Sequence, residues 1–460
     1  MSVKTIALLL GPIVACLVTW LMLISDPEGW HAAVTLGITL WIVIWWVFEP
    51  IPIPATSLLP LALLPLFGVL TAKEVGAAFG APLVLLLLGG FILATALEKS
   101  GAHKRIALSM VRAFGGSSSR RLVFGFMFAS AFLSMWISNT STVIMLLPVA
   151  MAVVSSSDDP DLPTPLLLGI AYGASIGGMG TPIGTPPNVV FMGVYEQVTG
   201  QQISFATWMG WALPIVFILL PIAGFWVTRK LSHQGEVRLP EIGEWRTAER
   251  RVFAVFALTA FAWITRLGPF GGWTEWLNVP YTNDAIVAFL GVVILFLVPN
   301  GEGGRLLDWE TANKIPWGML ILFGAGIAIA SAFINSGLSS QIGQTLEQLS
   351  TWHLFLMIAF ICLAVTFLTE VTSNTATTTL LMPILAAAAV GASTDPKLFM
   401  IPAALSASCA FMLPVATPPN LIVFSTGRFS VATMAREGFA MNLIGILVIS
   451  TVTYMLLSET

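Results

Sequence analysis

Long apolar segments alternate with short polar ones along the whole chain, and most are long enough to cross a bilayer as a helix. This pattern predicts about eleven membrane spans, with ends uncertain by a few residues. Nine uninterrupted spans lie at about 5–24, 32–48, 56–71, 81–98, 206–228, 252–267, 284–299, 316–335 and 438–457. Two more, at about 165–197 and 398–426, contain runs of glycine and proline that no regular helix tolerates, so each is predicted to be broken.

Two other apolar regions, at about 122–156 and 353–391, contain the same polar tripeptide at their centres. Ser138-Asn139-Thr140 divides the first region and Ser373-Asn374-Thr375 divides the second. The halves on either side of the first tripeptide are about 15 residues long, which is short for a full crossing.

Each tripeptide is followed by a second shared motif, which indicates an internal duplication. Thr185-Pro186-Pro187-Asn188 lies in the first broken span and Thr417-Pro418-Pro419-Asn420 in the second. From Asn139 to Asn188 there are 49 residues, and from Asn374 to Asn420 there are 46. Two motifs in one order at nearly one spacing make chance an unsatisfactory explanation.

The distribution of positive charge tests how these segments cross the membrane. If both tripeptide regions enter and return on one side, and the N-terminus is cytoplasmic, 17 of the 20 Lys and Arg residues lie on the cytoplasmic side. That asymmetry is what the positive-inside rule requires. Counting the first tripeptide region as an ordinary crossing would place the six cations of 229–251 outside. We therefore predict two re-entrant hairpins of opposite orientation, and hence an inverted repeat.

Composition agrees with a polytopic all-α membrane protein: 57% of residues are hydrophobic, 9% are charged and the mean hydropathy is +0.90. The first apolar segment has no clear cleavage site after it and is interpreted as an uncleaved span. No basic tail indicates a nucleic-acid partner, and the three cysteines share no spacing that would predict disulfides or a metal site. No nucleophile–base, HExxH or paired aspartate motif indicates an enzyme.

The chemistry of the four interruptions indicates a transport site. Irregular backbone at membrane depth is tolerated where it lines a protein or water cavity, and paired interruptions in an inverted repeat are typical of a transporter's central site. Ser, Asn and Thr offer both hydrogen-bond donors and acceptors, free helix N-termini attract anions, and freed carbonyl oxygens suit Na⁺. A single such motif is more often an interhelical hydrogen-bonding patch or a kink. The duplication of both motifs favours a functional site over a structural patch or kink.

The paired SNT motifs, the TEVTSNT context of the second and the two TPPN breaks resemble the divalent anion/sodium symporter family over essentially the whole chain. These are the sodium-coupled dicarboxylate and citrate transporters. The resemblance implies a homodimer in which a mobile transport part of each protomer carries the site across the membrane on a fixed scaffold, as an elevator. The scaffold would be 1–79 and 229–315, and the transport halves would be 80–228 and 316–460.

The resemblance also implies site residues, transferred motif by motif. The substrate carboxylates would be held by hydroxyl, amide and break residues of both halves: Ser138, Asn139, Thr140, Thr185, Pro186, Ser373, Asn374, Thr375, Thr417 and Pro418. A first Na⁺ would lie near Ser134, Ser138, Asn139 and Gly184. A second Na⁺ would lie near Thr369, Thr372, Asn374 and Ala416.

Glu370 lies one helical turn before Ser373, and its counterpart in the first repeat is Met135. An acid at membrane depth could bind a cation or a proton, or could accept hydrogen bonds from the backbone N–H groups of its hairpin; both alternatives stay open. Glu49, Glu98 and Glu196 fall near span ends, where the carboxylate is expected to reach the interface. Arg112 lies in an amphipathic connector and is expected at the membrane surface.

These observations predict a secondary transporter of a bacterial inner membrane that couples the uptake of small dicarboxylates to Na⁺. A dicarboxylate exchanger, or a Na⁺-coupled citrate or sulfate transporter of the same fold, remains an alternative. A channel is disfavoured, because two opposed hairpins leave no continuous polar stripe through the chain.

Overall fold

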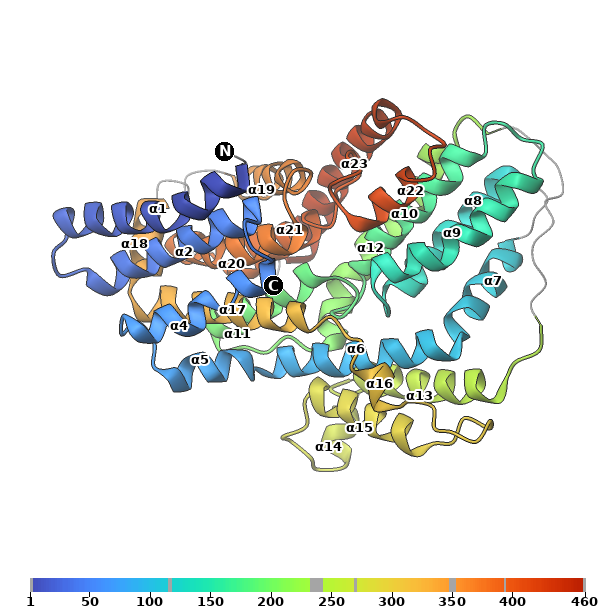
Figure 1. Ribbon diagram of the computed structural model, residues 1–460, viewed down its shortest axis with the longest axis horizontal. Coiled ribbons are helices and arrows are strands. Elements are labelled where there is room, and N and C mark those ends of the chain that lie inside the picture. Colours follow the sequence, from blue (N-terminus) through green and yellow to red (C-terminus); the bar gives the residue numbers. More distant parts are fainter. Residues whose placement is uncertain are drawn as a thin grey trace.

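The computed structural model describes residues 3–114, 118–231, 243–268, 271–346, 353–392 and 394–457 (Figure 1). These residues are helical apart from their connections, and contain one isolated β-bridge, between Pro299 and Arg305. Eight helical segments in this part of the chain are long and apolar enough to cross a membrane: α1, α2, α5 together with α6, α9, α12, α17, α20 and α23. The all-helical membrane class predicted from the sequence is confirmed at this level.

The N-terminal region forms two long antiparallel helices followed by short ones. The bounds are α1 (Val3–Ser25), α2 (Trp30–Phe48), α3 (Ile53–Thr56), α4 (Leu59–Leu66) and α5 (Ala72–Phe79). The single span predicted at 56–71 is wrong, since α3 and α4 replace it. Prolines explain the difference: Pro60 has no N–H to donate to the Thr56 carbonyl oxygen four residues earlier, and Pro65 likewise lacks an N–H inside α4.

The first repeat runs from α6 to α12. Its bounds are α6 (Pro82–Ser100), α7 (Ala102–Phe114), α8 (Ser119–Ser134), α9 (Asn139–Ser156), α10 (Pro163–Gly178), α11 (Pro186–Thr199) and α12 (Phe205–Thr228). The predicted break in the segment 165–197 is confirmed between α10 and α11. Every residue from Leu166 to Gly178 of α10 is buried, so this helix lies at the centre of the first half.

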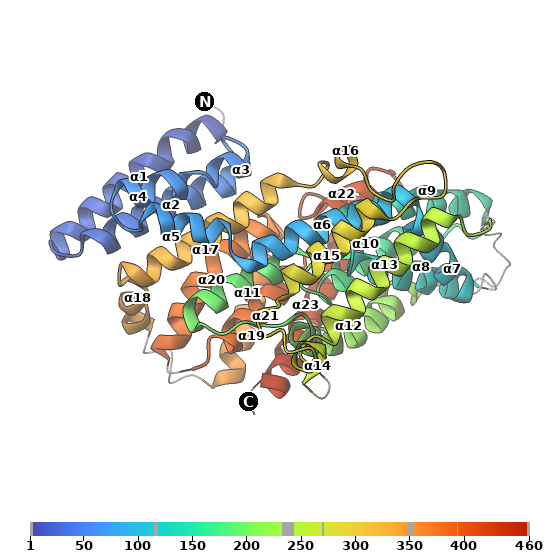
Figure 2. The same cartoon turned by 90° about the horizontal axis from the view of Figure 1, so that it is seen from below.

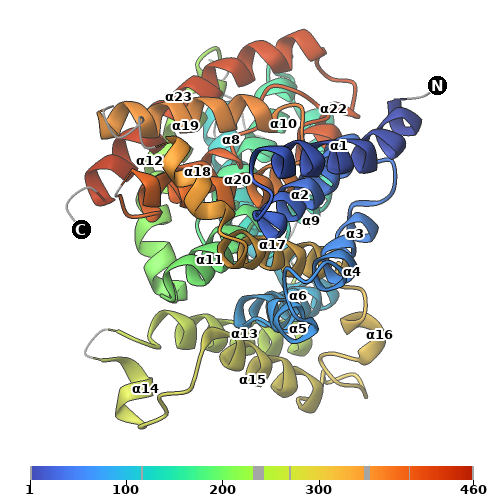
Figure 3. The same ribbon diagram turned by 90° about the vertical axis from the view of Figure 1, so that its left-hand side faces the viewer.

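Four helices lie between the repeats in the sequence and form a layer of their own: α13 (Thr247–Ile264), α14 (Gly272–Trp276), α15 (Asp284–Leu297) and α16 (Trp309–Ala312). In Figures 1 and 3 this layer lies along the lower edge of the molecule, and in Figure 2 α15 runs beside α6. An ion pair between Lys99, at the end of α6, and Asp308, before α16, ties the two together. The hydrogen bond from Lys99 and those from Thr311 lower the pKa of the Asp308 carboxyl to about 2.

The second repeat runs from α17 to α23. Its bounds are α17 (Trp317–Asn335), α18 (Leu338–Leu346), α19 (Leu354–Thr369), α20 (Asn374–Gly391), α21 (Lys397–Ser406), α22 (Pro418–Phe424) and α23 (Val431–Leu457). The predicted break in 398–426 is confirmed between α21 and α22.

The two repeats match helix by helix. α6 and α17 both have 19 residues, α8 and α19 both have 16, and α9 and α20 both have 18. In the first repeat α6, α8 and α9 begin at residues 82, 119 and 139, and in the second α17, α19 and α20 begin at 317, 354 and 374. The same difference in residue number separates the two members of each pair. The repeats also interlock, because α11 lies against α20 while α22 lies against α9. Each broken helix therefore packs on the helix pair of the other repeat.

Candidate functional site

A cavity of about 630 Å³ lies where the two repeats meet. Four helices begin at it, with Ser138, Thr185, Ser373 and Thr417 as the N-cap residues of α9, α11, α20 and α22. All ten residues predicted to hold substrate line this cavity. Its lining contains no Lys or Arg. The structure thus gathers residues from four distant parts of the chain around one space.

The first tripeptide forms the turn between α8 and α9. The Ser138 hydroxyl oxygen accepts a hydrogen bond from the Ser141 N–H at 3.1 Å, which caps α9. The Ser134 hydroxyl donates to the Asn139 side-chain oxygen. That contact closes the turn and fixes the Asn139 amide at the edge of the cavity.

The second tripeptide repeats this arrangement between α19 and α20. The Thr369 hydroxyl lies 2.6 Å from the Asn374 side-chain oxygen and 3.1 Å from the Ala407 carbonyl oxygen. Thr372, on the turn, lies 2.6 Å from the Thr377 hydroxyl. The two asparagines that were matched by sequence therefore have matched hydroxyl partners in space.

The asparagines of the two TPPN motifs hold the breaks closed. Asn188 is fully buried, and its amide donates to the carbonyl oxygens of Gly178 at 3.0 Å and Thr181 at 2.7 Å. Asn420 is also fully buried, and donates to Ala410 at 2.8 Å and Leu413 at 3.1 Å. Carbonyl groups freed by the interruption of a helix must be satisfied inside a membrane. These amides perform that task and position the start of α11 and α22.

Glu370 is a structural acceptor in this arrangement. Its carboxylate accepts hydrogen bonds from the backbone N–H groups of Phe411, Met412 and Leu413 at 2.8–3.0 Å, and from the Asn442 amide at 2.8 Å. Of the two alternatives left open by the sequence, the geometry favours acceptance of backbone hydrogen bonds. The N–H groups belong, however, to the break between α21 and α22 and not to the pair α19–α20.

Glycine permits a close approach of oxygen atoms among the residues expected at the first cation site. A Cβ added to Gly184 would lie 2.4 Å from the Gly178 carbonyl oxygen and 3.0 Å from that of Ser134. A Cβ added to Gly178 would lie 2.7 Å from the Asn139 side-chain oxygen. Carbonyl and amide oxygens are the ligands that a hard cation prefers. The oxygen atoms of both tripeptide regions, with glycine at the close approach in the first, are therefore compatible with Na⁺ as a transported ion.

Comparison with known proteins agrees with this geometry. The family model described as citrate transporter matches residues 43–398. The chain belongs to the citrate transporter family. It is 40% identical to the sodium-dependent dicarboxylate transporter SdcS of Staphylococcus saprophyticus, over 98% of this chain and 91% of that protein. Identity to SdcS of Staphylococcus aureus strain MRSA252 is 39%, over 99% of this chain and 91% of that protein.

The family assignment confirms the resemblance seen in the paired motifs, and confirms that the chain is a transporter and not an enzyme. Two solved transporters share the fold at low identity. YdaH of Alcanivorax borkumensis has a TM-score of 0.60 at 13% identity, over 86% of this chain and 88% of that one. MtrF of Neisseria gonorrhoeae has a TM-score of 0.56 at 14% identity, over 83% and 82%. These matches support the polytopic helical architecture alone.

In this member of the citrate transporter family, several cavity residues carry no sequence signal. Three apolar helices, α2, α6 and α17, wall the cavity with Trp46, Glu49, Leu87, Phe91 and Phe323. Glu49 lies at the end of a predicted span as expected, but it also lines the cavity. Among the described residues that line the cavity, Glu49 is the only charged one. Sequence patterns missed these residues because they depend on how apolar helices pack against the motifs.

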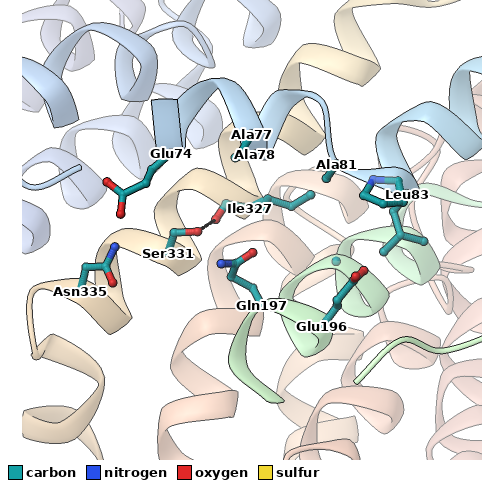
Figure 4. Close-up of a pocket in the computed structure, with 12 residues that line it drawn as sticks. Glu74, Ala77, Ala78, Ala81, Leu83, Glu196, Gln197, Ile327, Ser331 and Asn335 are labelled. Carbon is teal, nitrogen blue, oxygen red and sulfur yellow. Dashed lines mark hydrogen bonds between the residues drawn. The ribbon is translucent and has the colours of Figure 1, made fainter. Parts of the chain in front are cut away.

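A second cavity, of about 360 Å³, lies at the opposite end of α11 from the tripeptides (Figure 4). Glu74 of α5, Glu196 and Gln197 of α11, and Ser331 and Asn335 of α17 surround it. Glu196, predicted at an interface, accepts a hydrogen bond from the Gln202 amide at 2.7 Å. Gly193 of α11 and Ile327 of α17 also line this cavity and pack on each other, since a Cβ at Gly193 would lie 3.1 Å from the Ile327 side chain. α11 therefore begins at the first cavity and lines the second with its C-terminal half.

Proposed function

We propose that this protein is a Na⁺-coupled symporter of small dicarboxylates of the succinate, malate and fumarate type. One observation carries the proposal: α9, α11 and α20, of 18, 14 and 18 residues, all begin at a cavity without Lys or Arg. Helix N-termini supply unpaired N–H groups and partial positive charge, which suit carboxylates. Because that charge is partial, bound cations would supply the rest, and the oxygen clusters beside Asn139 and Asn374 suit them.

The names of the relatives support this assignment, since SdcS is named as a sodium-dependent dicarboxylate transporter. The family model is named for citrate, and citrate is therefore the alternative substrate to test first. Exchange of dicarboxylates without Na⁺, or transport of sulfate by the same fold, would keep the cavity but leave the proposed cation sites without a role.

We also propose an elevator movement in a homodimer of a bacterial inner membrane, with the N-terminus cytoplasmic. The hairpins α8–α9 and α19–α20, with the broken helices, would move; α1–α5 and α13–α16 would stay fixed. α6 packs tightly on α15, as a Cβ at Gly89 would lie 2.5 Å from the Ala288 Cβ. This contact favours assigning α6 to the fixed unit, although the predicted mobile part 80–228 includes it. Cross-links between cysteines in 56–71 and in 284–299 of separate protomers would test the dimer, and their complete absence would count against it.

The deciding experiment is uptake of radiolabelled succinate into proteoliposomes under an inward Na⁺ gradient, with a matched K⁺ gradient as control. Strong uptake under the Na⁺ gradient but not under the K⁺ gradient supports symport. Competition by unlabelled malate, fumarate, citrate and sulfate then ranks the substrates. Uptake that needs internal dicarboxylate but no Na⁺ would replace symport by exchange. The absence of uptake in both gradients would contradict the dicarboxylate assignment.

A further inference from the structure

Glu49 adopts a left-handed backbone conformation at the wall of the cavity. It ends α2 with φ 45° and ψ 53°, in the left-handed region. Among the residues that the structure describes, Glu49 and Asn278 are the two that adopt positive φ without being glycine. Asparagine tolerates that region, whereas glutamate rarely adopts it, and such residues concentrate at functional sites. The conformation turns the chain sharply at the wall of the cavity.

The turn is held rigidly from both sides. The Glu49 N–H donates to the Trp45 carbonyl oxygen at 3.0 Å, and Pro50 and Pro52 follow. The buried Trp46 indole donates to the Ser57 hydroxyl at 3.1 Å, which ties the end of α2 to the segment after the turn. The backbone of Glu49, from which the carboxylate projects, is therefore held in place at the cavity wall.

The carboxylate itself is exposed, and in the described part of the chain no residue forms a hydrogen bond or ion pair with it. It is also the single charge in the lining of a cavity where helix N-termini face the space. The C-terminal end of α2 adds partial negative charge beside it. The cavity lining therefore combines the negative charge of Glu49 with the partial positive charge of the helix N-termini.

We propose that Glu49 weakens the binding of the dicarboxylate on the cytoplasmic side: its carboxylate repels the dianion and attracts Na⁺. This inference rests on the proposed function and deepens it by assigning a positioning residue outside the repeat motifs. Coulomb interaction scales with charge, so a dianion experiences twice the interaction of Na⁺, with the opposite sign. In the proposed topology Glu49 lies at the cytoplasmic end of α2, where this repulsion also assists release into the cell.

The test is equilibrium binding of radiolabelled succinate to the purified full-length protein, titrated at several Na⁺ concentrations with choline as the balancing cation. For Glu49→Gln we expect two shifts of opposite sign. The half-saturating succinate concentration falls about tenfold, and the half-saturating Na⁺ concentration rises about threefold, as expected for a two-to-one ratio of charges. A merely structural defect weakens both ligands together, so opposite shifts separate the two explanations.

Three variants serve as controls. Glu49→Asp keeps the charge and tolerates the left-handed backbone, so its constants stay near those of the wild type. Glu49→Asn also tolerates that backbone but lacks the charge, and it reproduces both shifts. Glu28→Gln removes an exposed carboxylate at the other end of α2 and changes neither constant. Thermal unfolding of each purified variant reports whether it is folded.

Unchanged constants in Glu49→Gln and Glu49→Asn, or a parallel weakening of succinate and Na⁺, would overturn the role of Glu49 while wild-type binding keeps the proposed function intact. If the wild type binds succinate without any dependence on Na⁺, symport fails, and the shift in the half-saturating succinate concentration alone then tests the role of Glu49.

Discussion

The two halves of the cavity reach the same geometry through different local interactions. In both, a hydroxyl five residues before the asparagine contacts its side-chain oxygen: Ser134 with Asn139, and Thr369 with Asn374. In both, a buried TPPN asparagine donates to carbonyl groups ten and seven residues earlier. The surroundings of these shared contacts differ.

The first half relies on close backbone packing. Its break is short, from Gly178 to Pro186, and a Cβ at Gly177 would lie 2.1 Å from the Ala131 carbonyl oxygen. α8 and α10 therefore approach with little but backbone between them, and the Ser130 hydroxyl donates to the Ile170 carbonyl oxygen at 2.7 Å. Glycine makes this approach possible, because it has no side chain at the contact.

The second half has an equally close approach, since a Cβ at Gly438 of α23 would lie 2.1 Å from the Phe411 carbonyl oxygen, and it adds a carboxylate. Its break is longer, from Ser406 to Pro418, and leaves three consecutive N–H groups that Glu370 accepts. Met135 takes the corresponding position in the first half, as the C-cap of α8 where Glu370 is the C-cap of α19. The duplicated motifs thus supply the shared lining of the cavity, while each half satisfies its own freed backbone groups.

If the site is shared equally, Asn139→Ala and Asn374→Ala should both reduce Na⁺-driven succinate uptake by about 100-fold or more, since each removes an amide from the cavity and a partner from the adjacent turn. Uptake into proteoliposomes measures this, with size-exclusion chromatography to confirm a folded protein. Full activity in both variants would contradict the assignment of the site, and loss in one alone would mean that the halves contribute unequally.

The sequence predicted the shared part of this comparison well. The duplicated tripeptides, the TPPN breaks and the hydroxyls at 134 and 369 could be aligned because the same polar residues recur in apolar surroundings. The elements that differ could not be aligned. Gly177 and Glu370 act through contacts with segments 40 or more residues away in sequence, and their partners follow no local pattern.

The same limit applies to the walls and to α3 and α4. Trp46, Leu87 and Phe323 belong to apolar helices whose cavity-facing side has no polar signature. The segment 56–71 is apolar enough to be a span, but its prolines divide it into short helices. Hydropathy measures apolar length and does not register the N–H groups that prolines lack.

The close packing in the first half predicts that Gly177→Ala destabilises the protein by about 3 kcal/mol, because the new Cβ meets backbone atoms that cannot rotate away. The matched change in the second half is Cys409→Ala, at the residue that precedes Ala410 as Gly177 precedes Gly178. It shortens a buried side chain and should cost about 1 kcal/mol. Thermal unfolding of the purified variants compares them, and equal shifts would contradict the larger cost expected for Gly177→Ala.

The carboxylate of the second half predicts the next largest effect. Glu370→Gln replaces one acceptor oxygen by an NH₂ group that faces a backbone N–H, and should lower stability by about 2 kcal/mol. Met135→Leu, at the matched position, is a near-isosteric apolar change and should cost less than about 1 kcal/mol. Thermal unfolding gives both values. A Glu370→Gln variant of normal stability, but with altered dependence of uptake on pH, would support the proton-binding alternative instead.

The hydroxyls beside the asparagines predict the smallest and most specific difference. Ser134→Ala removes the donor to Asn139, while Thr369→Val removes a hydroxyl that lies near both Asn374 and the Ala407 carbonyl oxygen. Loss of one such hydrogen bond corresponds to about 1 kcal/mol, so we expect the half-saturating Na⁺ concentration to rise about fivefold for Ser134→Ala. Thr369→Val should raise it further, because its hydroxyl also connects α19 to the second break. Thr372→Ser retains a hydroxyl on the same turn and serves as the control. If uptake by Ser134→Ala and Thr369→Val keeps the Na⁺ dependence of the wild type, the cations do not bind beside these asparagines, and the matched hydroxyls serve the turns alone.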